Sequence, residues 1–259
     1  MSPNLPLSLA QLRIVLVEPA GPLNIGSVAR VMKNFGLSQL VLVNPQCDPY
    51  SGDAKQMAVH AYDLVEAAIT VKTLAEALVG CHRAIATTAR PRDLQTPLES
   101  PELALPWLVD AALPTALIFG PEDRGLNNDE MLHAQRFIKI ATCPTYESLN
   151  LAQAVAVCCY ELSRVGQRPV ENAFATDATA PLDVLDGYYH HLESILLKIG
   201  YLYPHTASSR MQKFRQLGHR ASLSAQDVAM LRGILRQIDW ATSRQDTTHQ
   251  IADHQSSDS

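Results

Sequence analysis

The stretch RIVLVEPAGPLNIGSVARVMKNFG, residues 13–36, contains a complete strand, turn and helix. Its first six residues are mostly apolar, as is typical of a strand that is covered on both faces of a parallel sheet. Prolines and a glycine at residues 19–22 mark a turn. Apolar side chains then recur with helical spacing, at Val28, Val31, Met32 and Phe35. Gly36 stands where such a helix would end, and Asn24, Gly26 and Arg30 on its first turns suggest a functional site.

Four more apolar runs repeat the strand pattern, at residues 39–44, 83–89, 115–120 and 137–142. Helical spacing separates them, at residues 53–68 and at 73–80, where Thr73 is expected to cap a helix with Glu76 at its third position and Gly80 after its end. This alternation predicts an α/β fold, a parallel sheet with right-handed crossovers. Ligands of such sheets bind beyond the carboxyl ends of the strands.

The second part of the chain has a different pattern, with helical spacing only. We predict an α/β domain at residues 1–166, a linker rich in Pro, Ala, Thr and Asp at 167–182, a helical extension at 183–241 and a disordered polar tail at 242–259.

Charge is distributed unevenly along the chain. The formal net charge is -5, but the segment Leu196–Trp240 has seven basic and two acidic residues. The remainder is therefore strongly acidic, and any nucleic-acid partner must bind a local basic patch. The candidates are Arg210, Lys213, Arg215 and Arg220. They would either contact an RNA backbone or form a solvated helix face.

The five cysteines are scattered and lack metal-ligand spacing, so we expect a reducing compartment and no metal site. The first twelve residues do not resemble a signal peptide, and no apolar run has the length of a membrane span. We therefore expect a cytoplasmic protein that does not bind membranes. The sequence also lacks GxGxxG after the first strand, GxxxxGK[ST], HExxH and GxSxG, which leaves dinucleotide, P-loop, zinc-protease and hydrolase chemistry without support.

Three loops that follow predicted strands contain the candidate site residues: LNIGSVAR (23–30), IFGPEDRGL (118–126) and YESLNLAQAV (146–155). The glycines of the second loop allow the backbone to approach a ligand closely, and the third loop opens a long helix whose free N–H groups can bind polar atoms. Each residue alone also has an ordinary explanation. Asn24, Ser148 and Asn150 could be helix caps, Gly120 and Gly125 turn glycines, and Arg30 a surface charge.

Taken together, the three loops resemble the motifs of the SPOUT class (TrmH-like) of RNA 2′-O-methyltransferases. NIGSVAR is similar to N-x-G-x-x-x-R, GPEDRGL to G-x-E-x-x-G-L and SLNLA to S-L-N-[LV]-[SA]. The stretch MKNFGLSQLVLVNP and the TTAR turn further resemble the TrmJ branch, the tRNA (cytidine/uridine-2′-O)-methyltransferases. IGYLYP and LRGILRQID look like the helical extension of that branch.

The resemblance implies a Rossmann-like sheet with a C-terminal trefoil knot, a homodimer, and S-adenosylmethionine as methyl donor. It implies that the donor is bound by Thr87, Thr88, Ala89, Gly120, Glu122, Gly125, Ile140, Glu147, Ser148 and Leu149. The catalytic residues it implies are Arg30, Asn24, Ser148 and Asn150. Arg30 would act in the pocket of the other subunit.

The substrate would be tRNA, at a cytidine or uridine that is the first nucleotide of the anticodon loop (position 32). Substrate contacts are expected from Arg30, Arg124, Arg210, Lys213, Arg215 and Arg220. One alternative is a SPOUT enzyme that modifies another tRNA position or ribosomal RNA. An alternative of another class is an RNA-binding module that has lost catalysis.

Overall fold

The computed structural model describes residues 7–88, 97–109, 113–165 and 179–256. The chain divides into two compact units, Met1–Thr176 and Asp177–Ser259. Among the described residues, no helix is both long and apolar enough to span a membrane.

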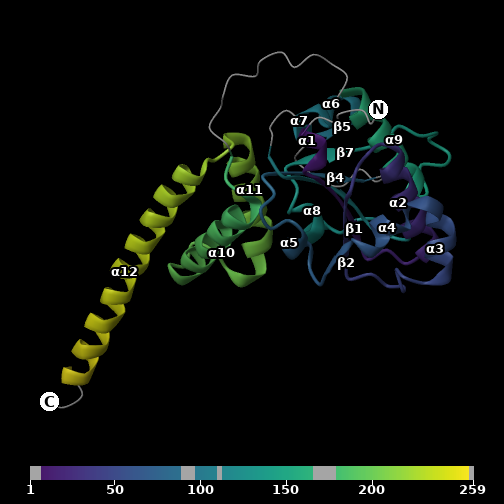
Figure 1. Ribbon diagram of the computed structural model, residues 1–259. Coiled ribbons are helices and arrows are strands. Elements are labelled where there is room, and N and C mark those ends of the chain that lie inside the picture. The colour runs from purple at the N-terminus through teal and green to yellow at the C-terminus, as the bar shows by residue number, and fades with distance from the viewer. Residues whose placement is uncertain (1–6, 89–96, 110–112, 166–178, 257–259) are drawn as a thin grey trace. The chain divides into compact units, whose positions relative to one another are not determined.

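The first unit is built on a seven-stranded parallel sheet with the order β3-β2-β1-β6-β4-β7-β5 (Figure 1). Its strands are β1 Leu12–Val17, β2 Gln39–Val43, β3 Ile69–Val71, β4 Arg83–Thr87, β5 Leu98–Glu99, β6 Thr115–Phe119 and β7 Arg136–Ile138. Its helices are α1 Leu7–Ala10, α2 Pro22–Asn34, α3 Gly52–Ala58, the 3-10 turn η1 Val59–Ala61, α4 Tyr62–Glu66, α5 Leu74–Ala77, α6 Pro101–Ala104, α7 Pro106–Val109, α8 Asn128–Met131 and α9 Leu151–Val165. The predicted parallel α/β sheet is confirmed.

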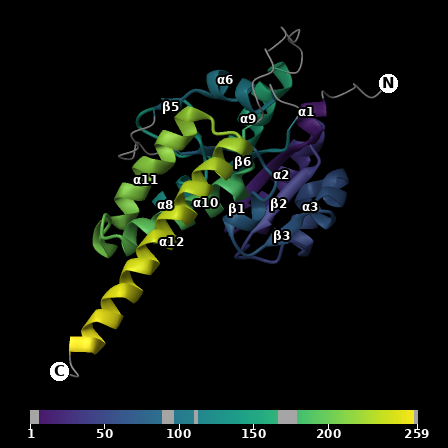
Figure 2. The ribbon, with the colours of Figure 1, turned by 90° about the vertical axis from the view of Figure 1, so that its left-hand side faces the viewer.

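The sheet has a main core on the side of α2 and α9, two helices that pack against each other. Ile14 and Leu16 of β1 are fully buried against Val28 of α2 and Val155 of α9. Figures 1 and 2 show α2 and α3 together beside the β1–β3 half of the sheet. The core thereby fixes the start of α2 beside the carboxyl ends of the strands, where a ligand is expected.

Five predicted strands correspond to β1, β2, β4, β6 and β7, whereas β3 and β5 were not predicted. These two strands form the edges of the sheet, have three and two residues, and are partly exposed. Short edge strands lack the long apolar run that marks a central strand. The predicted strand 137–142 ends at Ile138, because its partner β5 has only two residues.

The helix ends follow the local chemistry of the sequence. The Thr73 side chain accepts a hydrogen bond from the Glu76 N–H, and Gly36 and Gly80 have φ values of 74° and 76°, as expected for residues that end a helix. The single helix predicted at 53–68 is wrong: it breaks at Val59, whose φ is 53°. Just before this break the backbone of α3 packs directly against Gly26 of α2.

The second unit consists of α10 Leu182–Lys198, α11 Pro204–Ala221 and α12 Ala225–Ser256. Helix α10 packs against both others, around the buried side chains of Leu185, Tyr189, Met211 and Val228. Most of the expected linker lies outside the described residues, but the Ala180 N–H already donates to the Leu223 carbonyl of this unit. Residues 242–256 were expected to be disordered and are helical here. They contain no proline or glycine that would end α12.

Gly26 gives a first prediction, because a Cβ at this position would lie 2.3 Å from the Ala54 carbonyl oxygen and 2.9 Å from the Ala58 nitrogen. Gly26→Ala should force α2 and α3 apart and lower the free energy of unfolding by about 1–3 kcal/mol, measured by urea denaturation. Gly52→Ala is the matched control, since a Cβ at Gly52 meets nothing within 4 Å. Equal stability of the two variants would contradict the close packing of α2 on α3.

His219 of α11 gives a second prediction. Burial, aided by the charge of Arg215, lowers the pKa of its ring from 6.5 to about 4. Between these values the unfolded chain binds more protons than the folded one, so stability is intact above pH 6.5 and falls as the pH approaches 4. In thermal unfolding, wild type should lose up to about 3 kcal/mol more than His219→Gln over this range. A His219→Gln protein with the same pH profile as wild type would refute the assignment.

Candidate active site

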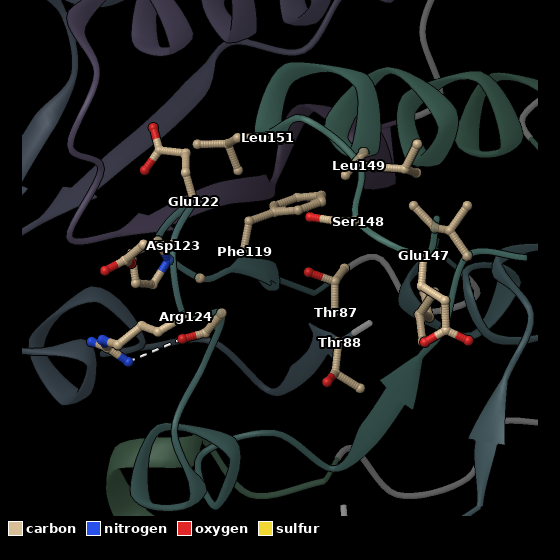
Figure 3. Close-up of a pocket in the computed structure, with 16 residues that line it drawn as sticks. Thr87, Thr88, Phe119, Glu122, Asp123, Arg124, Glu147, Ser148, Leu149 and Leu151 are labelled. Carbon is tan, nitrogen blue, oxygen red and sulfur yellow. Dashed lines mark hydrogen bonds between the residues drawn. The ribbon is translucent and has the colours of Figure 1, made fainter. Parts of the chain in front are cut away.

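A pocket lies at the carboxyl ends of β4, β6 and β7, where two of the three loops singled out in the sequence, 118–126 and 146–155, converge at the start of α9 (Figure 3). The first loop, 23–30, does not line it. It is lined by Thr87, Thr88, Phe119, Gly120, Pro121, Glu122, Asp123, Arg124, Gly125, Ile138, Ile140, Glu147, Ser148, Leu149, Leu151 and Ala154. All the residues expected to bind the methyl donor are among them except Ala89, which lies outside the described residues. Figure 3 shows Glu122 and Glu147 at opposite ends of the view, with Thr87, Phe119 and Ser148 between them.

Loop 120–126 closes tightly upon itself. A Cβ at Gly120 would lie 2.3 Å from the Leu126 nitrogen, Gly125 has a φ of 67°, and its N–H donates to the Pro121 carbonyl. Leu126 is buried and anchors the end of the loop. Only glycine permits this backbone geometry, which brings the backbone of the loop to the wall of the pocket.

Glu122 binds the N-terminus of α2. Its carboxylate accepts hydrogen bonds from the backbone N–H groups of Ala20 and Gly21, at 3.0 and 3.3 Å, and from the Asn24 amide, at 2.6 Å. Unpaired N–H groups and the helix dipole favour a negative charge at this place. Glu122, expected to hold the donor, thus joins the second loop to the first.

Asn24 and Asn150 continue this connection to the third loop. The Asn150 Nδ2 donates to Asn24 Oδ1 at 2.9 Å, and Asn150 Oδ1 accepts from the Ala152 N–H at the start of α9. Both were predicted as catalytic residues, and the structure places both in a hydrogen-bonded chain that assembles the site. Ser148 lines the pocket, and its hydroxyl has no hydrogen-bond partner in the described part of the chain.

Arg124 was expected to contact substrate, but its guanidinium is occupied by two carboxylates. It donates to Glu18 Oε2 at 2.6 Å and to both oxygens of Glu130, at 2.9 and 3.0 Å. Hydrogen bonds from Arg124 and Asn44 lower the pKa of Glu18, and the two carboxylates raise the pKa of Arg124. Arg124 therefore links the end of β1 to α8. This helix begins with a capping box, in which the Asn127 side chain accepts from the Glu130 N–H and the Glu130 carboxylate accepts from the Asn127 N–H.

Arg30 does not line the pocket of its own chain. Its side chain is exposed on α2, and within the described ranges it has neither a hydrogen bond nor an ion pair. It lies two turns of helix beyond Leu23 and shares a face of α2 with that exposed side chain. The predicted catalytic arginine is therefore available to a second molecule.

The basic candidates of the second unit separate into two groups. Arg210, Lys213 and Arg220 are exposed on α11. Arg215 instead points inward, donating to Asp186 Oδ1 at 2.8 Å and lying 4.8 Å from the centre of the Tyr189 ring. Sequence spacing alone did not distinguish Arg215 because its partners come from α10.

Several pocket residues were not predicted, among them Phe119, Asp123, Ile138, Leu151 and Ala154. Phe119 and Ile138 end buried strands and Leu151 begins a buried helix, so their sequence signal is that of core residues. Their position at the ends of these elements was the signal available, because strand ends border the ligand site of an α/β sheet. In the part of the chain that the structure describes, no three His, Cys, Asp or Glu side chains form a possible metal site.

Comparisons with known proteins match both units. Residues 11–160 match the SpoU rRNA Methylase family, and residues 183–249 match the family described as tRNA methyltransferase TrmJ, C-terminal domain. The tRNA (cytidine/uridine-2′-O-)-methyltransferase TrmJ of Salmonella typhimurium is 43% identical over 237 residues, 89% of this chain and 97% of the relative. The tRNA (cytidine/uridine/adenosine-2′-O-)-methyltransferase TrmJ of Pseudomonas aeruginosa is 41% identical over 88% of this chain and 93% of its own length. The crystal structure of TrmJ from Z. mobilis ZM4 aligns with a TM-score of 0.78 and 33% identity, over 88% of this chain and 98% of that one.

The binding of α2 by Glu122 gives a third prediction. Glu122→Gln replaces one acceptor oxygen by an amide that faces N–H donors, so the free energy of unfolding should fall by about 1–3 kcal/mol and amide hydrogen exchange should accelerate at residues 20–24. Asp123→Asn is the matched control, because Asp123 lines the same pocket but has an exposed side chain. Unchanged stability and exchange in Glu122→Gln would show that Glu122 serves a ligand and not the helix.

Proposed function

The chain belongs to the SpoU methylase family and has the C-terminal domain of the TrmJ methyltransferases, and on this premise we propose that it is an S-adenosylmethionine-dependent tRNA 2′-O-methyltransferase. The observation that carries the proposal is that two motif loops line one pocket and that Asn24 of the first motif loop is hydrogen-bonded to both of them, in a chain that also has the TrmJ domain. The nucleotide we propose is a cytidine or uridine at the first position of the anticodon loop, as the resemblance to the TrmJ branch implies.

The pocket has the chemistry that S-adenosylmethionine requires. Phe119, Ile140 and Leu151 offer apolar contact area for an adenine ring, and the exposed carboxylate of Asp123 offers a counter-charge for a cation. The Ser148 hydroxyl adds a polar group whose hydrogen-bonding capacity is available. Bound in this pocket, the donor supplies an electrophilic methyl group for transfer to a ribose 2′-hydroxyl.

The residues of the chain would position the acceptor and stabilise the charge that develops on it. Methyl transfer requires the 2′-hydroxyl in line with the methyl group and removes its proton. Arg30 is a poor base because its guanidinium remains charged in proteins. We therefore assign it the electrostatic stabilisation of the developing alkoxide, with the phosphate of the substrate accepting the proton.

The site would be completed by a homodimer in which Arg30 of the partner subunit enters the pocket. Arg30 is exposed and absent from the pocket lining of its own chain. On the neighbouring α9, Val157 and Tyr160 are 37% and 53% exposed, and on α2 Leu23 is 48% exposed. Exposed apolar side chains on two adjoining helices support an interface between copies that would bring two pockets and two arginines together.

The trefoil knot is proposed from the same family. Knots are rare exceptions among protein folds, and composition does not reveal them. The support here is that Ile138, Ile140 and residues 147–149 line the same pocket as loop 120–125 before the chain enters α9, which packs on α2.

For tRNA binding we propose the exposed Arg210, Lys213 and Arg220 of α11 as contacts to phosphates, because the main domain is acidic.

The test of the whole proposal is transfer of radiolabel from S-adenosylmethionine to total tRNA that lacks the modification, with the product mapped by nuclease digestion and mass spectrometry. Label on ribosomal RNA or at another tRNA nucleotide would replace the substrate. Failure to bind S-adenosylmethionine in calorimetry would favour an RNA-binding module without catalysis.

Arg30 gives the fourth prediction. Arg30→Ala should lower the rate of methyl transfer at least about 100-fold while the unfolding midpoint and donor binding stay unchanged, because only charge stabilisation is lost. Lys33→Ala, on the same helix and bound to Asp63 in the wild type, is the control that should remain active.

A mixture of variants tests whether Arg30 acts across the dimer. Leu149→Arg should block the pocket by placing a cation in it. Arg30→Ala and Leu149→Arg should therefore each be inactive alone. After subunit exchange, a heterodimer combines an intact pocket with an intact Arg30 from its partner. The mixture should regain about one quarter of wild-type activity, whereas a site made within one chain would regain none.

A further inference from the structure

The turn between α10 and α11 exposes two tyrosine rings that the proposed catalytic site does not use. Tyr201 is 52% and Tyr203 is 58% exposed, while Leu202 between them is only 2% exposed. Neither tyrosine hydroxyl has a hydrogen-bond partner in the described residues. A buried leucine between two exposed rings anchors the turn and displays both rings to solvent.

The backbone of this turn is well defined. Gly200 has a φ of 74° and ends α10, the Leu202 N–H donates to the Leu196 carbonyl at 3.0 Å, and the Thr206 N–H donates to the Tyr203 carbonyl at 2.9 Å. Pro204 at the first position of α11 restricts the chain further. Rings on such a turn lose little conformational entropy when they bind a ligand.

Each ring already has a planar or cationic neighbour. The His205 ring is stacked on Tyr203, with centroids 5.9 Å apart and an angle of 23° between the planes. The Arg210 guanidinium lies 5.9 Å from the centre of the Tyr201 ring. Both His205 and Arg210 are exposed, so the four side chains form one accessible group, here called the aromatic turn.

The chain segment that contains the aromatic turn is basic, and the nearby Asp239 of α12 is neutralised by its ion pair with Lys198 at 2.7 Å. No Asp or Glu occurs between Glu193 and Asp227, and within this interval the exposed Arg210, Lys213 and Arg220 lie on α11. Exposed aromatic rings beside cations and without acidic residues are the combination that binds single-stranded nucleic acid, because bases stack on the rings and phosphates meet the cations.

We propose that the aromatic turn, Tyr201, Tyr203, His205 and Arg210, binds unpaired bases of the RNA substrate by stacking. The proposal rests on the proposed function for the identity of the RNA, and it adds a second, base-stacking contact remote in sequence from the methylation motifs. The aromatic turn would contribute to the affinity for RNA and not to the methyl-transfer step.

The experiment measures binding of an unmodified tRNA transcript to the full-length protein. Tyr201→Ala and Tyr203→Ala should each weaken binding by about 5- to 150-fold, since stacking contributes roughly 1–3 kcal/mol per base. Tyr201→Phe and Tyr203→Phe should bind like wild type because they keep the ring. Trp240→Ala is the matched control, an aromatic side chain of the same unit that is 57% exposed outside the aromatic turn.

Salt dependence separates stacking from charge. The slope of log K against log salt should be unchanged in the tyrosine variants and about one unit smaller in Arg210→Ala, because only arginine releases counterions. In methylation assays the tyrosine variants should raise KM for tRNA and leave kcat unchanged.

Alanine variants that bind tRNA like wild type would overturn the proposal. Phenylalanine variants that bind as weakly as the alanine variants would also overturn it, because they would indicate a hydroxyl contact. A loss of affinity that accompanies a changed oligomeric state in light scattering would overturn it as well, because it would indicate a protein-docking surface. Failure of the proposed function is separate, because it would show as wild-type protein that methylates no tRNA.

Discussion

The carboxylate of Glu122 at the N-terminus of α2 is the interaction on which the site depends. It joins the loop after β6 to the turn after β1, and Asn24 is in turn hydrogen-bonded to Asn150 at the start of α9. These segments are far apart in the sequence, and each has N–H groups or amides that would otherwise be unpaired at the edge of the sheet. A single negative charge satisfies several of them and thereby holds the pocket loop 120–126 against the start of α2. Arg124, between Glu18 and Glu130, provides a second connection from β1 to the same loop.

This arrangement explains why the polar residues of the motifs are not all ligands. Glu122, Asn24, Asn150 and Arg124 use most of their hydrogen-bonding capacity on the protein itself. The groups left for a ligand are the backbone of the glycine loop, the Ser148 hydroxyl, the Asp123 carboxylate and apolar side chains at the ends of strands. A pocket held in this way is preorganised, because its walls are bound before a ligand arrives.

The proposed work divides between the main domain and the basic segment Leu196–Trp240 of the helical unit. The acidic main domain would hold a cationic methyl donor, whereas the helical unit displays basic side chains and aromatic rings to the RNA. Arg30, the proposed catalytic residue, is exposed on α2 and does not line the pocket of its own chain, so association of two chains would complete the proposed chemistry. Separation of donor binding, RNA binding and charge stabilisation lets each surface keep the composition that its ligand requires.

The sequence by itself determined the parallel α/β sheet, its central strands, the helical second unit and the loops that form the pocket, because apolar periodicity, glycines and the three motifs are local signals. It did not reveal the edge strands β3 and β5, which are short and partly exposed, nor the break at Val59, nor the helical continuation of α12. Only the tertiary structure decided the use of each polar side chain. Arg124 and Arg215 read as surface cations until carboxylates from other elements are placed beside them, and the exposure of Arg30 follows from the face of α2 on which it lies. The physical reason is that a side chain's partners come from elements distant in sequence, while periodicity reports only on neighbours along the chain.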